Sequence, residues 1–217
     1  IMKSDLEITK IEIVEFKHPV KNLGKDYNSF NLVYTPNNDL EMTGLILRIH
    51  TSEGIIGEYE GLSGPALAEV KIIADYLLGK NPLEREQIYN DTKRGLRHGA
   101  MLGTSIVDIC LWDIAGKAAN MPIYELLGSQ RDSIDAYATY PPRHIDYKGY
   151  VKEAAEIINS GFKAYKIHPG VMDTKNTIEM VNEVRKSVGP DIKLMFDPNC
   201  GYDYRKAYDI GQALDDN

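Results

Sequence analysis

The 217-residue sequence predicts an α+β segment followed by a strand–helix repeat with a parallel sheet. Three observations lead to this fold class. Apolar and polar residues alternate in the opening segments, as they do in strands with one buried face. A long segment with a broad apolar face follows, which is typical of a largely buried helix. From about residue 133 the pattern becomes β-α-β-α-β-α, which predicts right-handed crossovers between parallel strands.

Composition restricts the classes of protein that this chain can represent. Hydrophobic residues make up 43% of the chain and charged residues 26%, which is ordinary for a globular protein. The formal net charge is −7 and no basic run offsets it, so we expect neither a nucleic-acid partner nor binding to an anionic membrane. No apolar run approaches the roughly 20 residues that a membrane span requires.

Cysteine usage and the start of the chain bear on the compartment. The two cysteines, Cys110 and Cys200, are too few for a disulfide framework and indicate free or buried thiols in a reducing compartment. The first residues lack the apolar stretch of a signal peptide. We therefore expect a cytoplasmic protein.

The opening 62 residues are expected to form an antiparallel sheet. Apolar side chains such as Ile11, Ile13 and Phe16 recur at alternate positions in the first segment. Glycine and polar residues at Ser52 to Gly54 indicate a tight turn between two later segments. The sequence predicts strands over 7–17, 43–50 and 57–61, a loop over 18–30 and a hairpin turn over 51–57.

Helical patterns follow this sheet. Pro65 lies at a first-turn position where proline is tolerated, and Gly79 marks the end of the same helix. A later segment has a broad apolar face, with Asp108, Asp113 and Lys117 as its polar exceptions. The predicted helices cover 65–79, 83–94, 100–119 and, as a short turn, 122–128.

The remainder of the chain alternates between strands and helices. Strands are predicted over 134–139, 162–168 and 192–197, and helices over 147–159, 173–188 and from about residue 204. Ligands of parallel α/β folds bind at the face where the carboxyl ends of the strands meet. The ends of these strands are therefore the first place to look for a site.

Ionisable side chains collect at these strand ends. Because side chains alternate along a strand, Lys166 and His168 share one face of the second strand, and Asp197 ends the next strand. Together they form a compact acid/base and metal-ligand constellation that would project toward the interior of a barrel. A structural alternative is that Lys166 and Asp197 form an ion pair and that His168 caps its strand.

Five segments resemble the enolase superfamily, in its mandelate racemase/muconate lactonizing enzyme-like branch. They are EGIIGEYEG, SIVDICLWDIAGKAANMPIYELLG, IDAYAT, GFKAYKIHPG and LMFDPN, in the order that the family shows. The resemblance implies an α+β capping domain over residues 1–130, followed by the first part of a (β/α) TIM-like barrel over residues 131–217. It also implies magnesium-dependent removal of a proton alpha to a carboxylate.

The resemblance assigns roles to three side chains. Asp197 falls on the first ligand of the Mg²⁺ ion. Lys166 falls on the first lysine of the family's Lys-x-Lys motif, which helps to neutralise the substrate carboxylate. His168 replaces the second lysine, the usual base, and this is a departure from the family pattern. A histidine can act as a base at neutral pH without the lowered pKa that a lysine needs, or it can mark a member that does not use this face.

Three further residues are candidate substrate contacts. Asn199 lies two residues after Asp197, near the site in this family, and the alternative is a polar turn residue. Tyr137 and Thr139 end the first barrel strand, and ordinary strand residues are the simpler interpretation for both.

We therefore expect a magnesium-dependent enzyme that dehydrates a small-molecule sugar acid. The alternatives are a racemase, epimerase or cycloisomerase of the same superfamily and, in another class, a non-catalytic binding protein on this fold. The family's further metal ligands would lie beyond Asn217, so we expect these residues to be the N-terminal portion of a longer polypeptide. Family members are commonly homo-oligomers, and we expect the same here.

Overall fold

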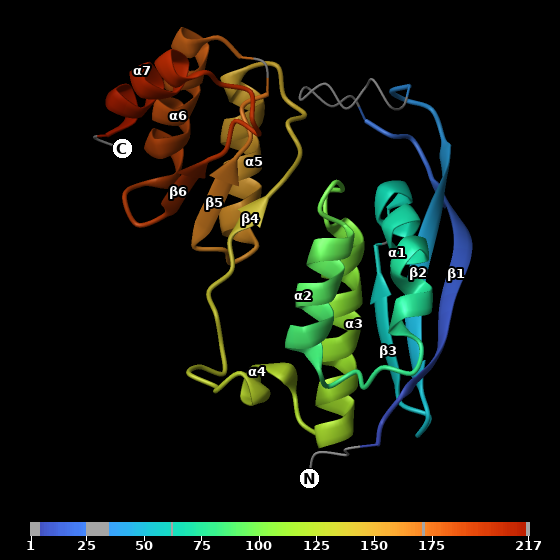
Figure 1. The fold of residues 1–217 in the computed structure, drawn as a ribbon. Coiled ribbons are helices and arrows are strands. Elements are labelled where there is room, and N and C mark those ends of the chain that lie inside the picture. Colours follow the sequence, from blue (N-terminus) through green and yellow to red (C-terminus); the bar gives the residue numbers. More distant parts are fainter. Residues whose placement is uncertain (1–4, 25–34, 62, 171, 216–217) are drawn as a thin grey trace. The chain divides into compact units, whose positions relative to one another are not determined.

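The computed structural model describes residues 5–24, 35–61, 63–170 and 172–215. The chain divides into two compact units (Figure 1). The first comprises Ile1–Pro19 and Glu41–Asp132, and the second comprises Val20–Leu40 and Ser133–Asn217. No helix in the described ranges is both long and apolar enough to cross a membrane.

The first unit contains a three-stranded sheet in the order β1-β2-β3, with β1 at Ile8–Val20, β2 at Leu40–Thr51 and β3 at Ile56–Glu60. Strands β2 and β3 pair antiparallel, from Ile46 opposite Glu60 to His50 opposite Ile56. The Thr51 hydroxyl closes the turn, since it donates to the Ile55 carbonyl at 2.9 Å and accepts the Ile55 N–H at 3.1 Å. The predicted hairpin is thereby confirmed.

The first two strands are longer than the sequence indicates. The predicted loop over 18–30 was wrong at its start, because β1 continues through His18 and Pro19 to Val20. Proline is tolerated there because β1 is an edge strand of this sheet, where a missing N–H need not break a ladder. Residues 25–30 of that predicted loop lie outside the described residues.

Helices follow this sheet along the chain, and their predicted positions are confirmed within a few residues. They are α1 at Gly64–Leu77, α2 at Arg85–Gly95, α3 at Leu102–Ala119 and the short α4 at Ile123–Leu126. Helix α3 lies very close to β3, and Gly57 permits this approach: a Cβ added there would be 2.1 Å from the Cys110 carbonyl oxygen. The core between them is apolar and includes Leu47, Ile49, Val70, Leu77, Leu111 and Ile114.

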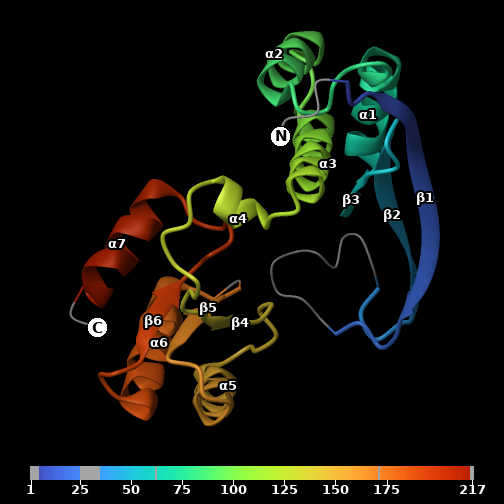
Figure 2. The same cartoon turned by 90° about the horizontal axis from the view of Figure 1, so that it is seen from below.

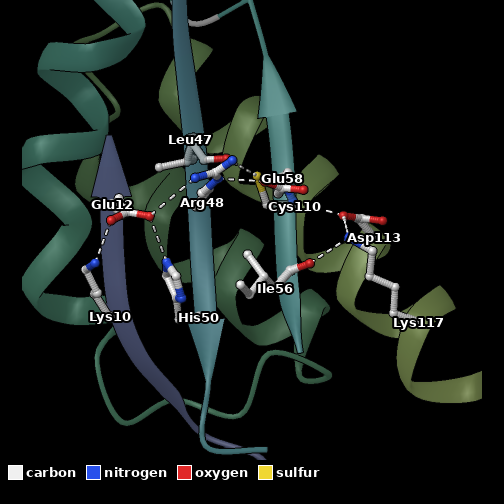
Figure 3. A network of polar contacts seen from close by, with 10 residues as sticks. All are labelled: Lys10, Glu12, Leu47, Arg48, His50, Ile56, Glu58, Cys110, Asp113 and Lys117. Carbon is white, nitrogen blue, oxygen red and sulfur yellow. Dashed lines mark hydrogen bonds and ion pairs between the residues drawn. The ribbon is translucent and has the colours of Figure 1, made fainter. Parts of the chain in front are cut away.

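Polar contacts tie α3 to β3 at the border of this core (Figure 3). The Lys117 ammonium donates to the Ile56 carbonyl and to Asp113, both at 2.7 Å. Asp113 also accepts the Glu58 backbone N–H at 2.9 Å. These bonds account for Asp113 and Lys117 on an otherwise apolar helix, because the two side chains satisfy one N–H and one carbonyl of β3.

The sheet also carries a row of charged residues from all three strands (Figure 3). Glu12 of β1 accepts from Lys10 at 2.6 Å and contacts the His50 ring nitrogen at 3.1 Å. Arg48 of β2 donates to Glu58 of β3 at 2.6 Å. Opposite charges on neighbouring strands stabilise a sheet face modestly, so these pairs favour the observed register.

The second unit contains a parallel sheet in the order β4-β5-β6, with β4 at Ala138–Thr139, β5 at Ala164–Ile167 and β6 at Lys193–Phe196. Helices α5 at Tyr147–Asn159, α6 at Thr174–Val188 and α7 at Tyr204–Leu214 follow the strands in turn. Helices α5 and α6 lie side by side next to the sheet (Figure 1 and Figure 2). The predicted order of strands and helices in this half is therefore confirmed.

The alternating faces of β5 agree with the prediction. Tyr165 and Ile167 are buried in the core that the helices complete, whereas Lys166 lies on the other face and is partly exposed. The first strand was predicted too long, because only Ala138 and Thr139 pair with β5. Ile134, predicted as its first residue, is 80% exposed. Apolar alternation alone did not reveal that residues 134–137 lack a ladder partner.

Candidate active site at the ends of the parallel strands

Lys166 and Asp197 meet at the carboxyl ends of β5 and β6. Lys166 pairs in register with Met195, so Asp197 stands one alternation further along the same face. The Asp197 N–H donates to the Ile167 carbonyl at 2.9 Å, which extends the ladder by one bond past β6. The Lys166 Nζ atom lies 3.3 Å from Asp197 Oδ2, within hydrogen-bond distance.

Two hydrogen bonds hold Asp197 in its ionised form. The Asn199 backbone N–H donates to Asp197 Oδ1 at 2.8 Å, and this bond is the main reason that the pKa of Asp197 is lowered. Lys166 lowers it further. In turn, the hydrogen bond to Asp197 raises the pKa of Lys166, with a smaller contribution from Tyr137. A carboxylate and an ammonium therefore stand together at neutral pH.

His168 follows the end of β5 by one residue. Its side-chain Nδ1 atom is buried and has no hydrogen-bond partner among the described residues. Its backbone carbonyl accepts a hydrogen bond from the Tyr150 hydroxyl at 2.7 Å. Among the described residues, no hydrogen bond at Nδ1 fixes the imidazole, and the Tyr150 bond fixes the backbone that carries it.

The three candidate substrate contacts occupy different surroundings. The Tyr137 ring is 46% exposed, and its centroid lies 5.2 Å from Lys166 Nζ, a cation–π distance. The Thr139 hydroxyl donates to the Lys166 carbonyl at 3.1 Å, so it is engaged in a hydrogen bond between β4 and β5. Asn199 is exposed, with a positive φ of 51°, and reaches the site through its backbone N–H. The roles of all six residues remain predictions.

The oxygen donors of the site bear on whether it can hold a magnesium ion. Asp197 offers ionised oxygen at an accessible rim, which is the donor chemistry that Mg²⁺ prefers. In the described ranges, no group of three or more His, Cys, Asp or Glu side chains is placed to hold a metal. Asp197 thus fits as one ligand of such a site, and the described residues do not complete it.

A network of hydrogen bonds to a buried carboxylate, Glu153 of α5, adjoins β5 and was not predicted from the sequence. Glu153 of α5 accepts from Tyr165, Arg143 and His144, and Tyr150 on the same helix reaches the His168 carbonyl. A signal was available, because Glu153 falls on the apolar stripe of α5 beside Ala154 and Ile157. A carboxylate on a buried stripe requires partners, and this indicates a network.

Two family models match separate parts of the chain. The first, "Mandelate racemase / muconate lactonizing enzyme, N-terminal domain", matches residues 39–128. The second, "Enolase C-terminal domain-like", matches residues 149–217.

Curated relatives carry several different activities. An arabinonate dehydratase of Saccharolobus solfataricus is 31% identical over 88% of this chain and 58% of its own length. An N-succinyl-L-Arg/Lys racemase of Bacillus cereus is 27% identical, over 91% of this chain and 53% of its own. A D-galactarolactone cycloisomerase of Agrobacterium fabrum is 33% identical, over 77% and 47%. The chain therefore spans about half the length of these relatives.

Solved structures with the same fold give a consistent result. A D-glucarate dehydratase from Agrobacterium tumefaciens, complexed with magnesium, superposes with a TM-score of 0.81 at 24% identity. The match covers 98% of this chain and 59% of that one. A member of the enolase superfamily from Polaromonas sp. JS666 gives 0.77 at 28% identity, covering 97% of this chain and 56% of that chain.

Proposed function

Because the chain belongs to the enolase/mandelate racemase superfamily, we propose that its first unit is an α+β capping domain and its second unit the first part of a (β/α) barrel. The separate family models for the two parts support this assignment. The parallel order β4-β5-β6, with a helix after each strand, is what the opening of such a barrel requires.

We propose that the whole protein is a magnesium-dependent enzyme that removes a proton alpha to a carboxylate, and that it dehydrates a sugar acid. The observation that carries this proposal is the 3.3 Å contact of Lys166 with Asp197, with His168 directly after the end of β5. Relatives such as arabinonate dehydratase and D-galactonate dehydratase favour a sugar acid as the substrate.

The side chains divide the chemistry between them. The Lys166 ammonium neutralises the substrate carboxylate and stabilises the negative charge that develops there. His168 accepts the alpha proton on an imidazole nitrogen, and the C–H electron pair moves into the enediolate. The electron pair then returns to expel the β-hydroxyl. The proton removed and the hydroxyl expelled together account for the water lost, and the enol product becomes a 2-keto acid.

Asp197 is the residue of this chain that would hold the metal. Magnesium, when bound, supplies positive charge that stabilises an enediolate far better than water does. The Asn199 N–H keeps one Asp197 oxygen aligned through its 2.8 Å hydrogen bond. Tyr137, Thr139 and Asn199 are proposed substrate contacts, with Tyr137 the most accessible candidate because its ring is exposed beside Lys166.

The test is a screen of the full-length protein against aldonic and aldaric acids with Mg²⁺, with detection of the 2-keto product. We expect product from at least one acid, and its loss on chelation with EDTA. His168→Ala should reduce the rate by at least about 10²-fold, as expected for a lost general base. The matched control is His98→Ala, because His98 is exposed and distant in sequence from the strand ends. Absence of a 2-keto product from every acid would contradict the dehydratase.

An isomerase is the second candidate, since the relatives include a racemase and a cycloisomerase. If the protein is an isomerase, the alpha hydrogen of the substrate should exchange for solvent deuterium without loss of water. NMR of the substrate in D₂O separates the two reactions directly. A non-catalytic binding protein would show neither, and His168→Ala would leave its ligand binding unchanged.

A further inference from the structure

Glu153 is the centre of a buried network that links the loop after β4 to α5 and β5. Its side chain is only 4% exposed and accepts three hydrogen bonds. Tyr165 OH donates at 2.6 Å, Arg143 Nε at 2.7 Å and His144 Nε2 at 3.0 Å. The His144 tautomer that fits this contact has its proton on Nε2, facing the Glu153 oxygen, and the contact fixes the direction of the imidazole.

The His144 ring supports Tyr150. The two ring centroids lie 5.0 Å apart with an interplanar angle of 78°, an edge-to-face arrangement. The ring of His144 lies across the first turn of α5 at Gly149, where an added Cβ would come within 2.5 Å of its atoms. Only glycine leaves that space, so α5, His144 and Tyr150 pack as one unit.

Beyond the last hydrogen bond of the sheet ladder, Tyr150 supplies the next bond to the backbone of β5's extension. The last ladder bond joins the Asp197 N–H to the Ile167 carbonyl. The next carbonyl, that of His168, instead accepts from the buried Tyr150 hydroxyl at 2.7 Å. Pro169 follows and has no N–H to bond. The hydrogen bond from the Tyr150 hydroxyl therefore holds the backbone of His168 just beyond the end of the strand.

We propose that Tyr150, supported by His144 and Glu153, is a positioning residue for the imidazole of His168; this rests on the proposed function for the role of His168 as base. The imidazole Nδ1 has no hydrogen-bond partner of its own among the described residues, so no bond at that atom holds the ring in place if its backbone shifts. A displacement of about 1 Å in a reacting group can cost on the order of 10²-fold in rate. The hydroxyl of Tyr150 prevents such a displacement.

The test compares Tyr150→Phe with Tyr76→Phe in the full-length protein. Each change removes one tyrosine hydroxyl that donates a hydrogen bond, to the His168 carbonyl from Tyr150 and to Asp91 from Tyr76, and Tyr76 has no part in the Glu153 network. Tyr150→Phe is expected to lower kcat by about tenfold with KM within about twofold, because positioning acts on the chemical step. Tyr76→Phe is expected to leave kcat within about twofold.

A second measurement does not depend on activity. NMR of the imidazole nitrogens follows the histidines of the protein, five of which lie in these 217 residues, and the His168 signals are assigned by their loss in His168→Gln. Tyr150→Phe should shift the His168 signals, whereas Tyr76→Phe should leave them in place. If the full-length protein turns over no acid, the proposed function fails, and these signals alone decide the position of His168.

Several results would overturn the proposal. One is an unshifted His168 signal in Tyr150→Phe. Another is an equal effect of both variants at equal loss of stability, which would indicate a general loss of packing. If Tyr150→Phe does not fold, Gly149→Ala replaces it, because the added methyl displaces the His144 ring that supports Tyr150. It should shift the same signals, and an unshifted signal there overturns the proposal equally.

Discussion

The candidate site consists of short-range contacts between single residues. The Asn199 N–H and the Lys166 ammonium each bond one oxygen of Asp197, so this carboxylate is oriented before any ligand arrives. Preorganised groups of this kind are what transition-state stabilisation requires. The consequences are best tested by changing one side chain at a time.

Removing the ammonium of Lys166 should have a large effect on catalysis. We expect Lys166→Met to lower kcat/KM of the full-length protein by at least about 10²-fold, because a developing negative charge loses its partner. Lys163→Met is the matched control, since Lys163 is exposed and precedes β5 at its other end. Steady-state kinetics on the acid found in the screen provides the measurement. Equal losses in both variants would contradict a specific role for Lys166.

The two cysteines should differ sharply in reactivity. Burial raises the pKa of the Cys110 thiol to about 12, so at pH 8 only about one molecule in ten thousand carries the thiolate. Cys200 is exposed. We expect iodoacetamide to label Cys200 alone in the native protein and both thiols in urea, as read by mass spectrometry of the peptides. Cys200→Ser should abolish native labelling, and rapid modification of Cys110 would contradict its burial.

At the scale of secondary-structure elements, side chains from one helix complete the end of another. Helix α3 begins after Met101, which has a positive φ of 59° and provides no side-chain cap. Glu69 of α1 supplies the missing acceptor, since it bonds the Gly103 N–H at 2.8 Å and the Met101 N–H at 3.2 Å. A carboxylate at a helix N-terminus also interacts favourably with the helix dipole.

We therefore expect Glu69→Ala to destabilise the protein by about 1–3 kcal/mol, because buried N–H groups lose their acceptor. Asp75→Ala is the control, because Asp75 is an exposed acid on the same helix and should change stability by no more than about 0.5 kcal/mol. Urea unfolding, followed by circular dichroism, measures both. If the two variants lose stability equally, Glu69 is not a cap.

At the scale of the whole molecule, our proposal gives this chain only part of a metal site. It spans 58% of the arabinonate dehydratase and 53% of the racemase that it matches. The parallel sheet of the described residues has three strands, and Asp197 is the only one of our predicted site residues that we assign to the metal. A single carboxylate leaves most of the coordination of Mg²⁺ to water.

An isolated 217-residue polypeptide should accordingly bind Mg²⁺ weakly. We expect a Kd of about 1 mM or weaker by isothermal titration calorimetry, and much tighter binding by a longer protein that supplies further oxygen ligands. Asp197→Asn in the longer protein should weaken its binding. Micromolar affinity in the 217-residue polypeptide, or full dehydratase activity from it, would contradict a metal site that needs ligands from a longer protein.

The sequence by itself determined the order of elements and the faces of β5. Both follow from local periodicity, since Tyr165 and Ile167 must alternate with Lys166 whatever the rest of the chain does. The five family-like segments similarly indicated the superfamily, because a motif is read from consecutive residues.

Only the tertiary structure decided which groups meet. It shows that Thr139 bonds a backbone carbonyl, that Glu69 caps α3, and that Tyr150 holds the His168 carbonyl. It also shortened the first parallel strand to two residues. Each of these contacts joins residues far apart in the sequence, and the packing of complete helices and strands fixes such distances, which local pattern does not encode.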